Sequence, residues 1–487
     1  MRKSEKFALL LILVLGLACF LSACGKNSEG GTGDAGTSEK IKTFSVGYGR
    51  TDITPDESVP LDSYGNAASR YSTGYLSRIY FNCIAITDAE NETLILCSYD
   101  ITQCNVQLLE DLRKYAKDTY GIKPDFVHLS GTHTHSSVAL GLDVPVVSAY
   151  KITLLKKAKE ALDQAMSDRL PAEMYAGETK TEKMNFVRHY WRADGTSCGD
   201  NHGNWSTAEV VSHVKDPDET MRVIKFTRKA KEGDAKDIVL VNWQAHNHLT
   251  GGATKYDLSA DFSCEMVKQL EKDKNCYATF FQGCAGDLNE QDSRLPENNR
   301  TTDFREYGQL LAGYVEGIYD TLDKRETGAV KSTIIDFSGP VNHTKDDLKK
   351  VAQTIYNNWV NSNYNGTNAI AEGKPYEIHS PYMASAIVTN ANLRETFDIK
   401  IQAYAIGDIG WTSVPLEMFD TTGEEIRKDS PFTFTFTQGY TDGSYGYLPT
   451  TDAYEYGCYE ADTTRWAPGT AEIIRDRLLE ALKSIHD

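Results

Sequence analysis

In the first part of the chain, continuous apolar runs alternate with segments whose apolar residues recur at helical spacing. Two runs rich in β-branched and aromatic residues lie between Ser77 and Asp100, and the polar stretch DAENET joins them, which predicts a pair of strands. Residues 105–121 have apolar positions at helical spacing and end on Gly121, a residue that easily adopts the left-handed conformation of a helix end. Another apolar run, DFVHLSG, follows. The order strand, strand, helix, strand is typical of an α/β sheet.

The same patterns continue to the end of the chain. They predict helices over residues 148–168, 344–363 and 470–485, and strands that run into polar loops over residues 237–252 and 277–291. Residues 361–377 are polar and predict an irregular surface segment. No internal repeat and no Pro- or Gly-rich break divides the sequence after residue 40. We therefore expect a single large α/β domain over residues 41–487, in which helices flank mixed β-sheets.

The N-terminus has the pattern of an export signal. Three basic residues come first, then an apolar stretch from Phe7 to Leu21, then small residues that lead into Cys24. The apolar stretch is shorter than the roughly 20 residues that a membrane-spanning helix needs. Its ending, LSAC, resembles a bacterial lipobox, in which the cysteine is lipidated and becomes the first residue of the mature chain. The alternatives are an ordinary signal peptide and an uncleaved anchor.

The lipobox interpretation divides the first 40 residues in two. Residues 1–23 would be a signal peptide, and Cys24 would carry the lipid that holds the protein to the membrane. Residues 24–40 are rich in Gly and Ser and predict a flexible linker. The expected location is the bacterial cell envelope, on the extracytoplasmic side of the membrane.

Charge and cysteine spacing narrow the class of protein. The chain has 51 basic and 69 acidic residues, a formal net charge of −18, which repels phosphate backbones and argues against a nucleic-acid partner. Eight cysteines remain after Cys19 and Cys24, scattered and without a C-x-x-C pair. We expect most of them to be buried thiols, although an extracytoplasmic location permits disulfides.

Two His-x-His stretches are the strongest chemical signal. His133 and His135 follow one predicted strand, and His246 and His248 follow another. Residues two apart on a strand face the same way, and ligand sites gather at the carboxyl ends of strands. Zinc prefers imidazole and carboxylate ligands, so the pattern predicts a zinc site. The alternative is that the histidines only hydrogen-bond their loops, and the sequence alone does not select a carboxylate ligand.

Several motifs together resemble a known family. The stretches that carry the resemblance run in family order between about Phe44 and Gly469: GYGRTDITP, LSGTHTHS, VNWQAHNH, LSADF, FQGCAGDLN, VPLE and GYLPTTDAYEYGCYE. They are similar to the catalytic domain of the neutral ceramidases, which are zinc amidases that hydrolyse the N-acyl bond of ceramide. The last motif stands shortly before the end of the sequence, so we expect no counterpart of the family's C-terminal immunoglobulin-like domain.

The resemblance implies a set of zinc ligands. They are His133, His246, Glu417 and Tyr447. His248 is the rival to His246, because the register of that motif shifts by a residue or two. Without the resemblance, Tyr447 would be interpreted as ordinary aromatic packing.

The resemblance also implies catalytic residues beside the metal. His135 would hydrogen-bond the substrate amide or the bound water, and Tyr459 would stabilise the developing oxyanion. Arg188, in the stretch NFVRHY, is similar to the family's active-site arginine. Packing is the alternative role for Tyr459, as it is for many of the chain's 27 tyrosines.

The chain departs from the family at one position. The family has a serine where this sequence has Gly283, and the neighbouring Cys284 is not an obvious replacement. A water molecule activated by zinc needs no such serine. Asp287, in the same Gly-rich turn, is expected to order the loop.

The sequence therefore predicts a zinc-dependent hydrolase of an N-acyl bond, with a ceramide-like lipid favoured and metal-activated water as the nucleophile. Two alternatives remain open. One is a non-catalytic binding lipoprotein on the same scaffold. The other is a zinc hydrolase of a small non-lipid amide or ester.

Overall fold

The computed structural model describes most of the chain after residue 42. The described residues are 43–63, 67–200, 202, 209–231, 233, 235–296, 299–362 and 364–486. They belong to one compact unit, Ile41–Asp487. The predicted signal peptide, the lipid attachment site at Cys24 and the predicted linker at 24–40 lie outside the described residues. Within the described part of the chain, no helix has the length and apolar character that a membrane crossing needs.

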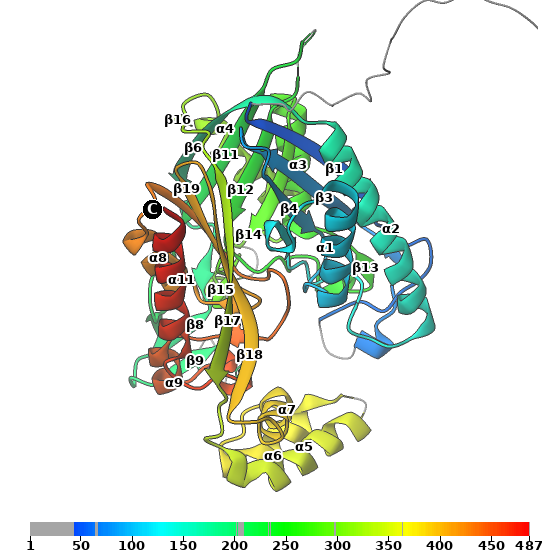
Figure 1. Cartoon of the computed structure of the whole chain (residues 1–487). Coiled ribbons are helices and arrows are strands. Elements are labelled where there is room, and N and C mark those ends of the chain that lie inside the picture. Colours follow the sequence, from blue (N-terminus) through cyan, green and yellow to red (C-terminus); the bar gives the residue numbers. More distant parts are fainter. Residues whose placement is uncertain are drawn as a thin grey trace, which may run out of the picture. The chain divides into compact units, whose positions relative to one another are not determined.

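A nine-stranded mixed sheet forms the larger layer (Figure 1). Along the sheet the strands run in the order β14 (Tyr277–Gln282), β12 (Ile238–Trp243), β11 (Thr220–Arg228), β6 (Leu170–Lys180), β1 (Ser45–Asp52), β3 (Tyr80–Thr87), β4 (Thr93–Tyr99) and β5 (Val127–Gly131), with β16 (Asp323–Arg325) paired to β6. The pairs β12–β14 and β4–β5 are parallel, and the other pairs are antiparallel. The expected α/β class with mixed sheets is confirmed.

Strand β14, at one end of this order, also contacts strands from the other half of the sheet. Ser98 on β4 donates from its hydroxyl to the carbonyl of Phe280 on β14 at 2.6 Å. Arg50 on β1 donates to the carbonyl of Ala278, also on β14, at 3.0 Å. Because β4 pairs with β5 and β14 pairs with β12, these contacts bring the strands that precede the two His-x-His stretches close together.

Helices cover the large sheet. The helices are α1 (Val106–Tyr120), α2 (Pro145–Ser167), α3 (Asp261–Lys274) and α4 (Phe304–Ile318). Helix α2 packs directly against β1, where a Cβ added at Gly49 would lie 2.0 Å from the carbonyl oxygen of Ala161. Helix α1 ends as predicted, with Gly121 in the left-handed conformation at φ 72°.

A second sheet carries the C-terminal part of the site. It runs in the order β17 (Val330–Pro340), β18 (Thr396–Ile406), β19 (Ile409–Ser413) and β21 (Phe434–Gln438), and α8 (Asp420–Asp429) and α11 (Thr470–His486) pack against it. Asn242 on β12 joins the two sheets by donating to the carbonyl of Thr437 at 3.3 Å.

Short elements complete the fold. They are β2 (Gly74–Tyr75) with β13 (Asp257–Leu258), β7 (Phe186–Val187) with β15 (Leu288–Asn289), β20 (Glu417–Met418) with β22 (Tyr447–Leu448), the sheet of β8 (His189–Arg192), β9 (Ser197–Gly199) and β10 (Val210–His213), and the helices α9 (Thr451–Tyr456) and α10 (Tyr459–Thr463).

A group of helices lies between β17 and β18 in the sequence and is drawn in yellow at the bottom of Figure 1. It consists of α5 (Lys349–Asn361), α6 (Gly366–Gly373) and α7 (Pro381–Asn390), and we call it the helical insertion. The expectation of an irregular segment over residues 361–377 is wrong for α6. This helix packs on α5, where Asn358 donates to Glu372 at 2.8 Å, so tertiary contacts outweigh its polar sequence.

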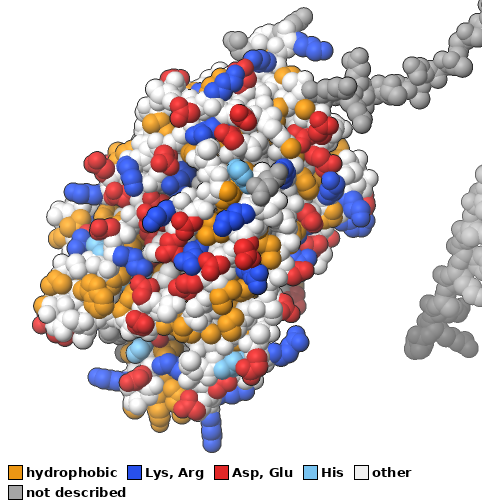
Figure 2. Space-filling model, turned by 60° about the vertical axis from the view of Figure 1, so that its left-hand side comes forward, with side chains coloured by type: hydrophobic (Ala, Val, Ile, Leu, Met, Phe, Trp, Pro, Cys, Tyr) orange, Lys and Arg blue, Asp and Glu red, His pale blue; other side chains and the backbone are white. Residues whose placement is uncertain are grey.

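The described cysteines agree with the expectation of thiols. All eight are free, and all are buried except Cys264, which is half-buried. Figure 2 shows acidic and basic side chains interspersed on one face of the protein, so the net charge is not gathered into a single acidic patch on that face.

Candidate metal and active site

The loops that follow β5 and β12 lie side by side, although the two strands are not neighbours in the sheet. Thr134 and Asn247 form a parallel bridge, and the backbone N–H of His135 donates to the Asn247 carbonyl at 3.0 Å. The Asn247 side chain is buried and donates to the Thr132 carbonyl at 3.3 Å. The two His-x-His stretches are therefore held together as parts of one site.

His133 and His246 turn the same ring nitrogen toward a common point. Nδ1 of His133 lies 2.9 Å from the Thr102 carbonyl oxygen, and Nδ1 of His246 lies 3.0 Å from that of Leu288. Because a carbonyl oxygen only accepts hydrogen bonds, each Nδ1 carries the hydrogen and each Nε2 keeps a lone pair. These Nε2 atoms lie 3.4 and 3.6 Å from Oε2 of Glu417.

Glu417 and Tyr447 enter the site from the paired strands β20 and β22. They lie opposite each other in this parallel pair, and the backbone N–H of Glu417 donates to the Gly446 carbonyl at 3.0 Å. Arg188 is buried and donates through Nη2 to the Tyr447 hydroxyl at 3.3 Å. The two-stranded pair β20–β22 thus carries two site residues that are distant from the histidines in sequence.

The side chains at this point fit a divalent cation. Nε2 of His246 and Oε2 of Glu417 are buried atoms without a hydrogen-bond partner in the described part of the chain. Burial raises the pKa of Glu417 to about 8, because the carboxylate loses its hydration. Burial also lowers the pKa of His133 to about 3, so its imidazole stays neutral. Neutral imidazoles and a carboxylate are ligands that zinc prefers.

His135 and Tyr459 lie next to these residues. Nε2 of His135 is 3.1 Å from Nε2 of His133. Tyr459 is the first residue of α10, and its ring lies edge-on to that of Tyr447, with the centroids 5.8 Å apart. Burial raises the pKa of Tyr459, so its hydroxyl keeps its hydrogen at neutral pH and can donate it in a hydrogen bond.

Arg188 is fixed by a buried ion pair. Its Nε donates to Oε1 of Glu460 at 2.6 Å, and its Nη2 donates to the Gly286 carbonyl at 2.9 Å. Burial acts to raise the pKa of Glu460, but the charge of Arg188 and the charge and hydrogen bond of His189 together outweigh this effect and hold the pKa at about 2. Arg188 therefore has a fixed geometry from which it holds the hydroxyl of Tyr447.

The two histidines of the second stretch face different carboxylates. His246 faces Glu417, whereas Nδ1 of His248 lies 2.9 Å from Oε1 of Glu290. The sequence left both His246 and His248 as candidate ligands. The geometry favours His246, because it faces the same carboxylate oxygen as His133.

The position of the missing serine is closely packed. A Cβ added at Gly283 would lie 2.8 Å from Oε1 of Gln244 and 2.9 Å from its Cβ, so a serine does not fit without displacing that side chain. Cys284 is buried, and burial raises the pKa of its thiol to about 12, which disfavours the thiolate. Asp287 accepts the backbone N–H of Asp420 at 2.9 Å and orders its loop, as expected.

Sequence reasoning missed the residues that support the site. Glu460 stands directly after Tyr459, but only the fold shows that it pairs with Arg188. The ring of Tyr440 lies 4.1 Å from that of His133, centroid to centroid, at 36°. The backbone carbonyls of Thr102 and Leu288 carry no sequence signal, because any residue supplies a carbonyl.

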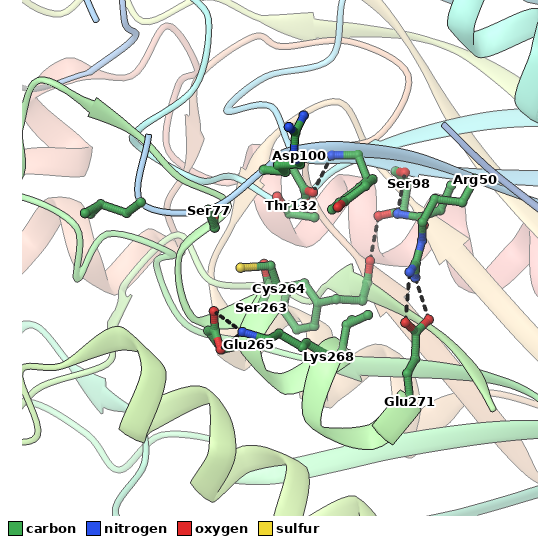
Figure 3. A pocket seen from close by; sticks show the side chains of 16 residues that line it. Arg50, Ser77, Ser98, Asp100, Thr132, Ser263, Cys264, Glu265, Lys268 and Glu271 are labelled. Carbon is green, nitrogen blue, oxygen red and sulfur yellow. Dashed lines mark hydrogen bonds and ion pairs between the residues drawn. The ribbon is translucent and has the colours of Figure 1, made fainter. Parts of the chain in front are cut away.

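A pocket of about 310 Å³ lies elsewhere, between β4, β14 and α3 (Figure 3). Arg50 and Glu271 point toward each other there, with Nη1 and Nη2 donating at 2.9 and 2.7 Å. Thr132 lines this pocket, but the neighbouring His133 and the other predicted site residues do not. The site formed by the two His-x-His stretches and this pocket are therefore at different places in the protein.

The arrangement of the sheets and helices defines the class of fold, which is neutral ceramidase-like. It is similar to the crystal structure of neutral ceramidase from Pseudomonas aeruginosa, with a TM-score of 0.68 and 16% identity, over 91% of this chain and 74% of that one. It is also similar to a ceramidase complexed with C2, with a TM-score of 0.67 and 15% identity, over 91% of this chain and 75% of that one. No protein-family model matches the sequence. The resemblance that the motifs indicated is thus confirmed at the level of the fold.

Proposed function

We propose that this protein is a zinc-dependent hydrolase that cleaves an N-acyl amide bond, with a ceramide-like lipid as the favoured substrate. The observation that carries the proposal is the convergence of His133 Nε2, His246 Nε2 and Glu417 Oε2 on one point. The similarity of the fold to structures described as ceramidases supports the choice of an amide substrate.

Four residues would hold the zinc ion: His133, His246, Glu417 and Tyr447. When bound, zinc polarises a carbonyl group and lowers the pKa of a water molecule from 15.7 to about 7. The Nδ1 hydrogen bonds to Thr102 and Leu288 keep both Nε2 lone pairs available to it.

The chain's own residues would bind and polarise the amide. His135 and Tyr459 lie beside the ligand set and donate hydrogen bonds to the oxygen on which negative charge develops. Arg188 acts through Tyr447, whose hydroxyl it fixes at 3.3 Å. Because Arg188 is itself tied to Glu460, the ligand set keeps its geometry when substrate binds.

The packing around Gly283 and Cys284 supports water as the nucleophile. No hydroxyl stands at position 283, and the thiol of Cys284 is buried and disfavoured as a thiolate. Direct attack by water leaves no acyl group on the protein. Because the family's serine is missing, we expect ceramide itself to be a poor substrate, or to be replaced by another N-acyl compound.

An aromatic path from the site supports a lipid substrate. The ring of Tyr459 lies 6.1 Å from that of Tyr382, which lies 5.1 Å from that of Trp359 in the helical insertion. Trp359 is buried in the helical insertion and Tyr382 is exposed, so the ring of Tyr382 is an apolar surface beside the site that suits an acyl chain.

Two measurements test the chemistry. Purified protein is assayed for fatty acid release from ceramides, other N-acyl amides and esters, before and after metal removal. In parallel, the intact mass is recorded during turnover. We expect metal-dependent amide hydrolysis, no acylated protein, and nearly full activity in Cys284→Ala. A mass increase equal to one acyl chain that is absent in Cys284→Ala would contradict the proposal.

We further propose that the protein is anchored outside the cytoplasm through a lipid on Cys24, which the signal-like N-terminus and the LSAC ending support. Cell fractionation of Cys24→Ala tests this point. The variant is expected to leave the membrane fraction, and its retention there at the mature size would contradict the anchor.

A further inference from the structure

A second group of metal-ligating side chains lies outside the site described above. It consists of His202, which follows β9, His379, which precedes α7 in the helical insertion, and Asp462 in α10. Nε2 of His202 lies 3.0 Å from Nδ1 of His379. Oδ2 of Asp462 lies 2.7 Å from that same Nδ1 and 3.2 Å from Nε2 of His202. Three segments distant in sequence thus bring three ligand atoms together.

The three facing atoms address one point. When both facing nitrogens carry hydrogen, each donates it to Oδ2 of Asp462, and hydrogen bonds hold the triangle. When both nitrogens turn a lone pair inward, the same three atoms form a set of metal ligands, and a bound cation takes the place of the two hydrogens.

The chemistry of the three ligand atoms indicates the class of cation. Two imidazoles and one carboxylate form a set that suits zinc and neighbouring transition metals better than calcium or magnesium, which prefer oxygen ligands. The side chains of His379, Asp462 and His202 are 40%, 13% and 6% exposed, so the group is open to solution on the His379 side. A metal ion can therefore reach it, with water in the remaining coordination position.

We propose that His202, His379 and Asp462 form a second site for a divalent transition metal, which joins the helical insertion to α10. The two parts already touch, since Asn390 donates to the Thr464 carbonyl at 3.0 Å. Asp462 lies three residues after Tyr459 on the same helix. A metal at Asp462 would therefore hold the helical insertion against the helix that carries Tyr459.

Metal stoichiometry tests this proposal on the full chain in detergent. The protein is stripped with a chelator, and zinc binding is measured by equilibrium dialysis and elemental analysis. Cobalt absorption spectra report the coordination. The variants are His379→Ala, Asp462→Asn and His246→Ala. His343→Ala is the matched control, because His343 forms a similar pair with Asp346 at 2.9 Å.

We expect two zinc ions per chain in the unsubstituted protein and in His343→Ala. One ion should remain in His379→Ala, in Asp462→Asn and in His246→Ala. The proposal is overturned if His379→Ala and Asp462→Asn both keep two ions, or if the unsubstituted chain binds a single ion that His246→Ala removes. A single ion that His379→Ala removes and His246→Ala keeps would support this second site and contradict the zinc site of the proposed function. Far-UV circular dichroism confirms that each variant is folded.

Discussion

His133 and Glu417 meet with Nε2 and Oε2 3.4 Å apart, although one follows a strand of the large sheet and the other begins a two-residue strand beside the smaller sheet. The side chain of His133 is 3% exposed and that of Glu417 is 13% exposed, and Nε2 of His133 keeps a lone pair because Nδ1 carries the hydrogen. Burial raises the pKa of Glu417 because the ionised carboxylate is costly in this contact, and a cation between the two groups would remove that cost.

Replacing His246 and His248 one at a time shows which of the two is the zinc ligand. His246→Ala should bind one zinc ion fewer than the unsubstituted chain, because it removes an Nε2 that faces Glu417. His248→Ala should keep its metal, because His248 faces Glu290. Elemental analysis of the two purified variants measures the difference. The opposite result would assign the ligand to His248.

Gly283→Ser should lower stability. The new Cβ would lie within 3 Å of the Gln244 side chain, whose Nε2 donates to the Asp218 carbonyl at 2.6 Å. Such overpacking costs about 1–3 kcal/mol in the free energy of unfolding. Urea unfolding measures it, with Gly141→Ser as the control, because a Cβ at Gly141 meets no atom within 4 Å. Equal midpoints for the two variants would show that the site has room for a serine.

Tyr459→Phe should lower kcat by about 100-fold or more and leave the zinc content unchanged, as losing one oxyanion donor typically does. The hydroxyl keeps its hydrogen because burial raises its pKa. Tyr376→Phe is the control, since Tyr376 is exposed in the helical insertion. A variant that keeps full kcat would assign Tyr459 to packing.

Asp287→Asn should stabilise the protein more at pH 8 than at pH 5. Burial raises the pKa of Asp287 to about 6, above the roughly 3.9 of an unfolded chain. The folded chain therefore binds more protons between these values, and its stability falls as the pH rises through them. Asparagine removes this loss of stability, which is at most about 3 kcal/mol for a pKa difference of about 2 units. Urea midpoints at both pH values measure it, with Asp347→Asn as an exposed control, and a gain that does not depend on pH would contradict the assignment.

Local features of the fold were predictable from the sequence, and long-range ones were not. The strands β3 and β4 and the end of α1 at Gly121 follow from patterns within a few residues. Helix α6 does not, because its contacts with α5 outweigh a polar sequence. Packing between distant segments carries no local signal.

The site divides in the same way. Both His-x-His stretches were visible because they end apolar strands, but no spacing rule brings Thr134 beside Asn247. Motif resemblance selected Glu417 among 69 acidic residues, which periodicity does not do. The pairing of Arg188 with Glu460 became visible only in the folded chain.

The most direct test of the account follows fatty acid release from an N-acylated lipid while zinc is returned to the metal-free protein. Glu417→Gln, which keeps the shape of the side chain and removes its charge, is measured beside it. We predict that the metal-free protein is inactive, that activity rises with zinc occupancy of the site at His133 and His246, and that Glu417→Gln stays nearly inactive. Full hydrolysis by the metal-free protein, or by Glu417→Gln without bound metal, would contradict the account.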